Sequence, residues 1–262
     1  PHCYHCPWGR EYPDCDLECA GALEEKIKEL GADQVAAFIA EPVMGTGGVI
    51  IPPPGYYQKI RAICDTHEVL LIDDEVINAF GRTGLMFGID HWEGVRPDFM
   101  TIAKAISSGY VQLGAVALSD EIFQTLKTLD KIMHGYTYSG DPLACAVGLK
   151  NLEIIERENL TANSKAMGQR LLQGFLDLDH ELIGEVRGKG LMVGVELVKD
   201  RRTKEKFETP LAQKVVDIAY AKGLITRPLI NDVLQFSPPL SISESEVDEI
   251  VRIVHESINE AQ

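Results

Sequence analysis

Three short apolar runs divide the first half of the chain and define its expected core. Glycine, proline or polar residues bound each of them, at residues 69–72, 99–103 and 115–118. Continuous apolar runs of this length are typical of strands that are buried on both faces, as in a parallel sheet. The sequence therefore predicts an α/β fold with a mostly parallel sheet.

Segments of helical periodicity fill the gaps between these runs. Apolar positions recur at helical spacing in residues 20–30 and 56–67, and residues 35–40 form a further apolar strand. A strand, a helix and a second strand in this order predict a right-handed βαβ unit. Further helices are expected at residues 119–128, 142–158 and 163–178.

The pattern changes near residue 181, where short strands and helices of mixed order begin. Ser243 and Glu246 have the spacing of a capping box, which predicts the start of a final helix. Before it, strands are expected at residues 186–198, 224–228 and 233–236, and a helix at residues 211–222. We predict a large α/β domain in residues 1–160 and a small α+β domain in residues 161–262.

Two charged residues follow two of the predicted strands. Asp74 ends the first run and Lys104 ends the second. In a parallel sheet, ligands bind beyond the carboxyl ends of the strands, so an acid and an amine would face one pocket. A strand also often ends in a charge because the chain leaves the core there, and for either residue alone this explanation is favoured.

The charge balance limits the classes of partner. The chain has 262 residues, with 40 acidic against 25 basic side chains and a formal net charge of −15. Nucleic acids and anionic membranes need a basic face, so neither is expected as a partner. We find no signal peptide, and no apolar run has the length of a membrane span. We expect the cytoplasm or the mitochondrial matrix, and the start on Pro1 suggests part of a longer chain.

Four cysteines cluster in the first 19 residues. Cys3 and Cys6, then Cys15 and Cys19, have spacings that approximate those of metal ligands, and two histidines lie nearby. A zinc site is one hypothesis. The other is a loop with free thiols packed around aromatic residues, and we assign no metal ligand because the second pair falls where a helix is expected to start.

Six ordered motifs together resemble the class III aminotransferases, pyridoxal-phosphate enzymes of fold type I. The resemblance runs through nearly the whole chain and implies the C-terminal portion of such an enzyme, without the family's N-terminal part. The motifs are residues 40–48 (AEPVMGTGG), 74–84 (DEVINAFGRTG), 103–115 (AKAISSGYVQLGA), 136–140 (YTYSG), 187–192 (RGKGLM) and 237–240 (SPPL).

The resemblance implies a role for individual residues. Lys104 would be the catalytic lysine that bonds to the cofactor, pyridoxal 5′-phosphate. Three others would also bind this cofactor: Asp74 at the ring nitrogen, Val76 on a ring face, and Thr137 at the phosphate of a neighbouring subunit. Glu41 and Arg227 would face the substrate. The role of Thr137 implies a homodimer or a tetramer.

The expected function is transfer of an amino group from an amine or amino acid to a 2-oxo acid such as pyruvate or 2-oxoglutarate. Residues 1–160 would then be a truncated cofactor-binding domain, and the isolated chain would be weakly active or inactive. A lyase or an aminomutase on the same scaffold would use Lys104 and Asp74 equally well. A non-catalytic α/β module is the remaining alternative.

Overall fold

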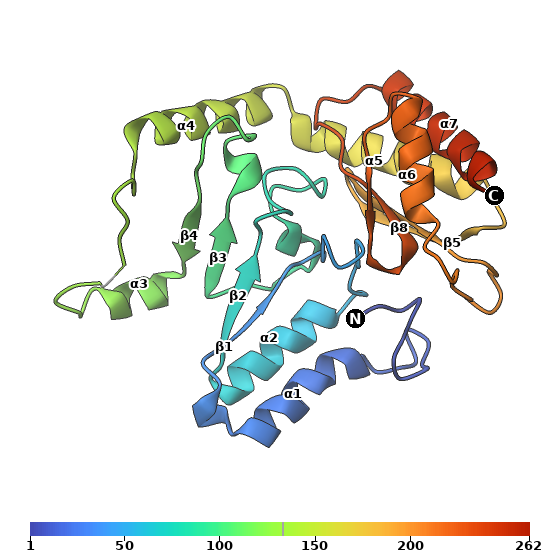
Figure 1. The fold of residues 1–262 in the computed structure, drawn as a ribbon. Coiled ribbons are helices and arrows are strands. Elements are labelled where there is room, and N and C mark those ends of the chain that lie inside the picture. Colours follow the sequence, from blue (N-terminus) through green and yellow to red (C-terminus); the bar gives the residue numbers. More distant parts are fainter. Residues whose placement is uncertain (133) are drawn as a thin grey trace. The chain divides into compact units, whose positions relative to one another are not determined.

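The computed structural model describes residues 1–132 and 134–262 (Figure 1). Two compact units are present. Unit 1 comprises residues 1–42, 52–80 and 87–158, and unit 2 comprises residues 43–51, 81–86 and 159–262. The chain therefore enters unit 2 three times. Two short loops, residues 43–51 and 81–86, contribute to it first, and from residue 159 to the end the chain stays in unit 2. The predicted assignment of residues 1–160 and 161–262 to two domains stays a prediction.

A four-stranded sheet forms the centre of unit 1. Its order is β1 (Ala37–Ala40), β2 (Leu70–Asp74), β3 (Phe99–Ile102) and β4 (Ala115–Leu118). The first three strands are parallel, as predicted, and β4 is antiparallel to β3. The expectation that residues 115–118 are buried on both faces is wrong, because β4 is an edge strand whose four residues are all exposed.

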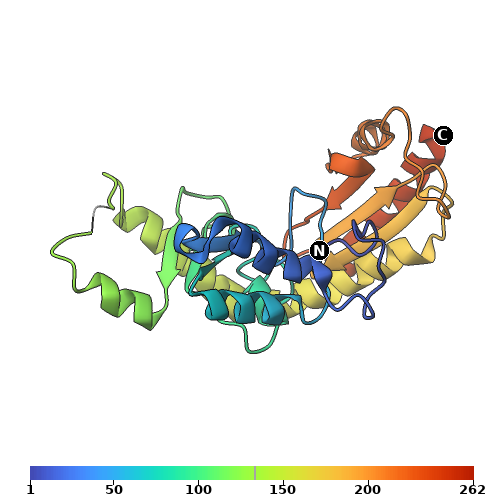
Figure 2. The ribbon, with the colours of Figure 1, turned by 90° about the horizontal axis from the view of Figure 1, so that it is seen from below.

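Helices α1 (Glu18–Leu30) and α2 (Tyr56–His67) run side by side in unit 1 (Figures 1 and 2). Their apolar faces form one core with β2, because apolar positions at helical spacing lie on the same side of a helix. Buried members of this core include Ile27, Ile60 and Leu71. Short 3₁₀ helices lie at η1 (Ala32–Gln34), η2 (Gly88–His91) and η3 (Lys104–Ile106), and α3 (Asp120–Leu126) and α4 (Pro142–Arg157) follow β4.

Unit 2 contains an antiparallel sheet with helices, as the α+β pattern predicts. The strand order is β5 (Ile183–Lys189), β6 (Met192–Leu197), β8 (Val233–Phe236) and β7 (Arg227–Leu229). Its helices are α5 (Leu160–Asp177), α6 (Ala212–Ala221), the 3₁₀ turn η4 (Ile230–Asp232) and α7 (Glu244–Ala261). All six residues of β6 are buried, and they join the apolar faces of the helices in one core.

The predicted capping box is confirmed at the start of α7. The backbone N–H of Ser243 donates to Glu246, and the hydroxyl of Ser243 accepts from the backbone N–H of Glu246. None of the helices in the described part of the chain is both long and apolar enough to cross a membrane.

Candidate active site

Three predicted site residues lie at one edge of the sheet in unit 1. Glu41 directly follows β1, Asp74 ends β2, and one residue separates Lys104 from the end of β3. Because these strands are parallel and adjacent, their carboxyl ends share one edge. The structure thus brings the acid and the amine to neighbouring strand ends, as the sequence predicts.

The carboxylate of Asp74 is held in place by its neighbours. Its Oδ1 accepts hydrogen bonds from the Thr101 hydroxyl at 3.2 Å and from the Val76 backbone N–H at 3.1 Å. Thr101 is the register partner of Asp74 on β3. Both bonds use the same oxygen and fix the orientation of the side chain. The other oxygen, Oδ2, is free to accept a proton-bearing group of a ligand.

Lys104 begins the 3₁₀ turn η3 in a conformation that a lysine rarely adopts. Its φ is +43°, in the left-handed region, and its side chain is exposed. Such a backbone costs about 1–2 kcal/mol for a residue other than glycine, and it tends to persist at functional sites. Among the described residues, its ammonium makes no hydrogen bond and no ion pair. The amine is therefore available to a ligand at the sheet edge.

A pair of buried carboxyl groups lies on the other face of β2. Asp73 is 2% exposed and Glu75 is 0% exposed. Among the described residues, no other group donates a hydrogen bond to either oxygen of Asp73 or to Oε2 of Glu75. A hydrogen bond between the two carboxyl groups therefore requires one of them to keep its proton. Burial, and then the neighbouring Glu75, raise the pKa of Asp73 to about 9. Asp73 is thus a neutral acid at pH 7 and donates to Glu75.

Glu75 is anchored on its other side. Its Oε1 accepts the backbone N–H of Ile89 at 2.9 Å, and burial raises its pKa as well. Sequence analysis gave no role to Asp73 or Glu75, and alternation along the strand places both on the face opposite to Asp74. The pair is therefore a structural feature beneath the site, and Asp74 alone is directed to the ligand edge.

Glu41 is fixed through its backbone. The Tyr57 hydroxyl on α2 donates to the Glu41 carbonyl at 2.6 Å. Burial raises the pKa of the Tyr57 hydroxyl, which therefore stays a donor over the physiological range. Val76 is half-buried directly after Asp74. Thr137 is exposed in the segment between α3 and α4, and no contact in the described chain tests its expected role at a neighbouring subunit.

Arg227 lies in unit 2, at the start of β7. Its Nε donates to Oε1 of Gln235 on the adjacent strand at 2.6 Å. Gln235 is only 6% exposed, whereas Arg227 is exposed. The terminal nitrogens of Arg227 have no partner among the described residues, and its one neighbour is neutral. Sequence analysis missed Gln235, because only the strand pairing places it opposite Arg227.

Three of the family motifs meet inside unit 2. The Arg82 guanidinium donates to the carbonyls of Leu191 at 3.0 Å and Pro238 at 2.5 Å, and the Leu191 N–H returns a bond to the Arg82 carbonyl at 3.0 Å. Burial lowers the pKa of Arg82 to about 10. At Gly190, with φ +51°, a Cβ would lie 2.3 Å from the Thr83 carbonyl carbon. These motifs therefore form a tightly packed junction of three loops.

The groups at the sheet edge of unit 1 fit pyridoxal 5′-phosphate. The cofactor offers an aldehyde, which takes an amine, and a ring nitrogen, which takes a carboxylate when protonated. Lys104 supplies an amine without a competing partner, and Asp74 supplies a carboxylate with one oxygen free. Among the residues that the structure describes, Thr137 is the one predicted to bind the phosphate.

Comparisons with known proteins agree with this fit. Residues 3–258 match the aminotransferase class-III family. Diaminobutyrate–2-oxoglutarate transaminase of Halomonas elongata is 43% identical over 92% of this chain and 53% of its own length. A leucine/methionine racemase of Thermococcus litoralis is 42% identical over 95% of this chain and 56% of its own length.

A solved transaminase from work on ancestral reconstruction has a TM-score of 0.95 and 42% identity, and it matches 100% of this chain and 59% of its own. The chain thus spans little more than half the length of the relatives it matches. Class III members depend on pyridoxal phosphate and have fold type I. On this evidence the chain belongs to the class III aminotransferase family.

Proposed function

We propose that this chain is part of a transaminase that moves an amino group from an amine or amino acid to a 2-oxo acid such as pyruvate or 2-oxoglutarate. The observation that carries the proposal is the placement of Asp74 and Lys104 at neighbouring carboxyl ends of β2 and β3. The class III family and the transaminase relative support it.

The bound cofactor supplies an electron sink that stabilises negative charge at the substrate carbon. Lys104 Nζ would hold the aldehyde end of the cofactor, and as a free amine it would take a proton from the substrate carbon and return it. Asp74 Oδ2 would stabilise the positive charge of the ring nitrogen, while the Thr101 hydroxyl and the Val76 backbone N–H keep the carboxylate oriented. The Val76 side chain would pack on a ring face and exclude water. Thr137 would bind the phosphate of a neighbouring subunit.

Arg227 and Glu41 select the substrate. The guanidinium of Arg227 has a planar fork that matches a carboxylate, and Gln235 occupies its Nε, so both terminal nitrogens remain for the substrate. Glu41 offers a carboxylate beside β1, fixed through the bond from Tyr57 to its backbone. Donors and acceptors that carry a carboxylate would bind Arg227 directly.

The proposed assembly is a homodimer or a tetramer, because Thr137 would serve a neighbouring subunit and is exposed here. We place the reaction in the cytoplasm, since none of the six cysteines, all of them in the described part of the chain, forms a disulfide, which suits a reducing compartment. The relative from Halomonas elongata, a bacterium, gives no support to a mitochondrial location.

A second candidate is racemisation of an amino acid. The racemase of Thermococcus litoralis is nearly as similar to this chain as the transaminase, and the same lysine and carboxylate serve both reactions. The two differ in product. A racemase inverts the substrate carbon and keeps the nitrogen, whereas a transaminase releases a 2-oxo acid or an aldehyde. A lyase or an aminomutase would likewise be identified by its product.

The test uses the full-length parent and the 262-residue chain, each incubated with pyridoxal phosphate. We expect the parent to form a yellow adduct that borohydride fixes to Lys104, located by mass spectrometry of the peptide. It should then consume an amine only when pyruvate or 2-oxoglutarate is present. Lys104→Ala should abolish both results. An active parent whose adduct maps to another lysine would refute the assignment, and a Lys104→Ala variant that changes nothing would favour a non-catalytic module.

We expect the 262-residue chain to bind the cofactor weakly and to turn over poorly, because Thr137 is its one predicted phosphate contact. Equilibrium dialysis with pyridoxal phosphate measures this affinity directly. Activity of the isolated chain equal to that of the parent would contradict the expectation.

A further inference from the structure

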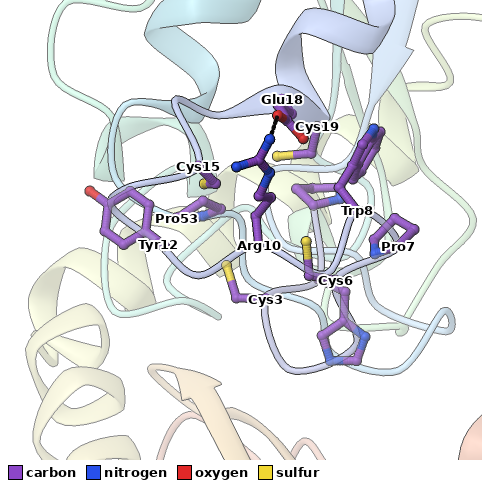
Figure 3. A pocket seen from close by; sticks show the side chains of 12 residues that line it. Cys3, Cys6, Pro7, Trp8, Arg10, Tyr12, Cys15, Glu18, Cys19 and Pro53 are labelled. Atoms are coloured by element: carbon purple, nitrogen blue, oxygen red, sulfur yellow. Dashed lines mark ion pairs between the residues drawn. The ribbon is translucent and has the colours of Figure 1, made fainter.

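Four thiols from the first 19 residues line one cavity in unit 1. Cys3 and Cys6 come from consecutive turns, Cys15 from a third turn, and Cys19 from the first turn of α1. Figure 3 shows the four cysteine side chains among those that line this cavity, with the Arg10 side chain running between them. The cavity has a volume of about 20 Å³, which is room for one water-sized species.

We propose that these four cysteines bind a single Zn²⁺ ion in a structural site. Four thiolates are a common zinc ligand set, and the spacings Cys-x₂-Cys and Cys-x₃-Cys both fall within the range of such sites. Burial raises the pKa of the Cys19 thiol, so the thiolate there would be formed by metal binding itself. Cys19 does lie at a helix start, as the sequence predicts, and its side chain lines the same cavity as the other three thiols.

The charge around the cavity suits this site. Zn²⁺ with four thiolates has a net charge of about −2. The guanidinium of Arg10 lines the same cavity and carries a positive charge, and it also pairs with Glu18 at 3.4 Å. A cation in the wall offsets the excess negative charge of a filled site.

The segment also needs a stabilising element. Residues 1–17 form only turns and irregular structure, and Trp8 and Tyr12 are exposed at 43% and 41%. Such a loop buries little apolar area, so a metal that binds only the folded form would stabilise it. The site would fix this loop against α1 and the Pro53 segment, which lines the same cavity.

Binding requires the sulfur atoms to move inward. Zinc–sulfur bonds of about 2.3 Å place tetrahedral sulfur atoms about 3.8 Å apart. Among the described residues, no three of these thiols have sulfur atoms all within 4.8 Å of one another. Three of the four cysteines, Cys3, Cys6 and Cys15, lie in the irregular segment before α1, where side-chain rotation can move the sulfur atoms.

The first measurement is the metal content of the 262-residue chain, purified under reducing conditions without added chelator. We expect one zinc per chain by inductively coupled plasma mass spectrometry. Cys6→Ser and Cys19→Ser should each lose most of it. Cys145→Ser is the matched control, because Cys145 is an exposed thiol of the same unit and should leave the zinc unchanged.

The second measurement needs no variant and so does not depend on whether the variants fold. The chain is stripped of metal and titrated with Co²⁺ alone under anaerobic conditions. We expect the intense visible absorption of tetrahedral cobalt–thiolate coordination, saturating at one equivalent and displaced by Zn²⁺. Absence of this absorption, a disulfide among the four cysteines under reducing conditions, or an iron–sulfur chromophore in the chain as purified would each overturn the proposal.

Discussion

Replacement of Asp73 by asparagine is expected to stabilise unit 1 at neutral pH. Asp73 is buried on β2 and donates its proton to Glu75. The amide of the Asp73→Asn variant would place an NH₂ donor at the same position, so the bond to Glu75 is kept. The substitution removes only the ability of the unfolded chain to ionise at this position.

The magnitude follows from linkage between proton binding and folding. The pKa of Asp73 is raised from 3.8 to about 9 in the folded protein. Its contribution to stability is therefore complete below about pH 4 and is lost as the pH rises towards 9, because the unfolded chain releases the proton and the folded chain retains it. Relative to the Asp73→Asn variant, the wild type should lose about 1.4 kcal/mol per pH unit, or at most ~4 kcal/mol by pH 7.

The assay is urea unfolding followed by tryptophan fluorescence between pH 4.5 and 8. Both tryptophans lie in unit 1, and Trp92 is 4% exposed in its core, so the signal reports this unit. Asp130→Asn, at an exposed position, is the control and should show no such trend. A difference between Asp73→Asn and wild type that stays constant with pH, or a variant that is less stable than wild type at pH 7, would refute the shared-proton description of Asp73 and Glu75.

Three further predictions concern unit 2. Gln235→Leu removes the acceptor that orients Arg227. In the full-length parent, KM for amino donors that carry a carboxylate should rise several-fold, while KM for a diamine without a carboxylate stays the same. Equal changes of KM for both donors would argue against this role of Gln235. Ser243→Ala deletes the cap of α7 and should lower the free energy of unfolding by about 1 kcal/mol, measured by circular dichroism, with Ser241→Ala, at an exposed position before the cap, as control. Gly190→Ala should destabilise unit 2 far more, because the added Cβ would lie 2.3 Å from the Thr83 backbone and φ at this position is positive. Hydrogen exchange of the β6 amides should therefore accelerate. A variant as stable as wild type would show that the junction of loops can relax.

Much of the fold was predictable because its elements have strong local signals. The helix predicted at residues 56–67 has the same bounds as α2, and the capping box located the start of α7 within one residue. The apolar runs located β2 and β3 because strands buried by helices need uninterrupted apolar sequence. Residues 115–118 have the same kind of sequence, but pairing order, which a local pattern does not encode, makes β4 an antiparallel edge.

The candidate site was predictable where strand ends mark it. Asp74 and Lys104 follow apolar runs, so the rule for parallel sheets sufficed to place them at one edge. Partners from other strands were not predictable in this way. Thr101 and Gln235 hold Asp74 and Arg227 through cross-strand register, which depends on how the strands align. The roles of Thr137, Glu41 and Arg227 stay predictions.

The repeated entry of the chain into unit 2 limits how this unit can be separated by cleavage or truncation. The loop of residues 43–51 supplies the Gly48 carbonyl, which accepts from buried Arg187 at 2.6 Å, while Arg187 also pairs with Glu196. The loop of residues 81–86 supplies Arg82 to the Leu191 and Pro238 carbonyls. A polypeptide of residues 159–262 alone would lack both loops. The buried guanidinium of Arg187 would then lose the Gly48 carbonyl as a hydrogen-bond acceptor. After a protease cut between residues 51 and 81, the bond from Arg187 to the Gly48 carbonyl would still join the two pieces, whereas the bonds of Arg82 would lie within the second piece.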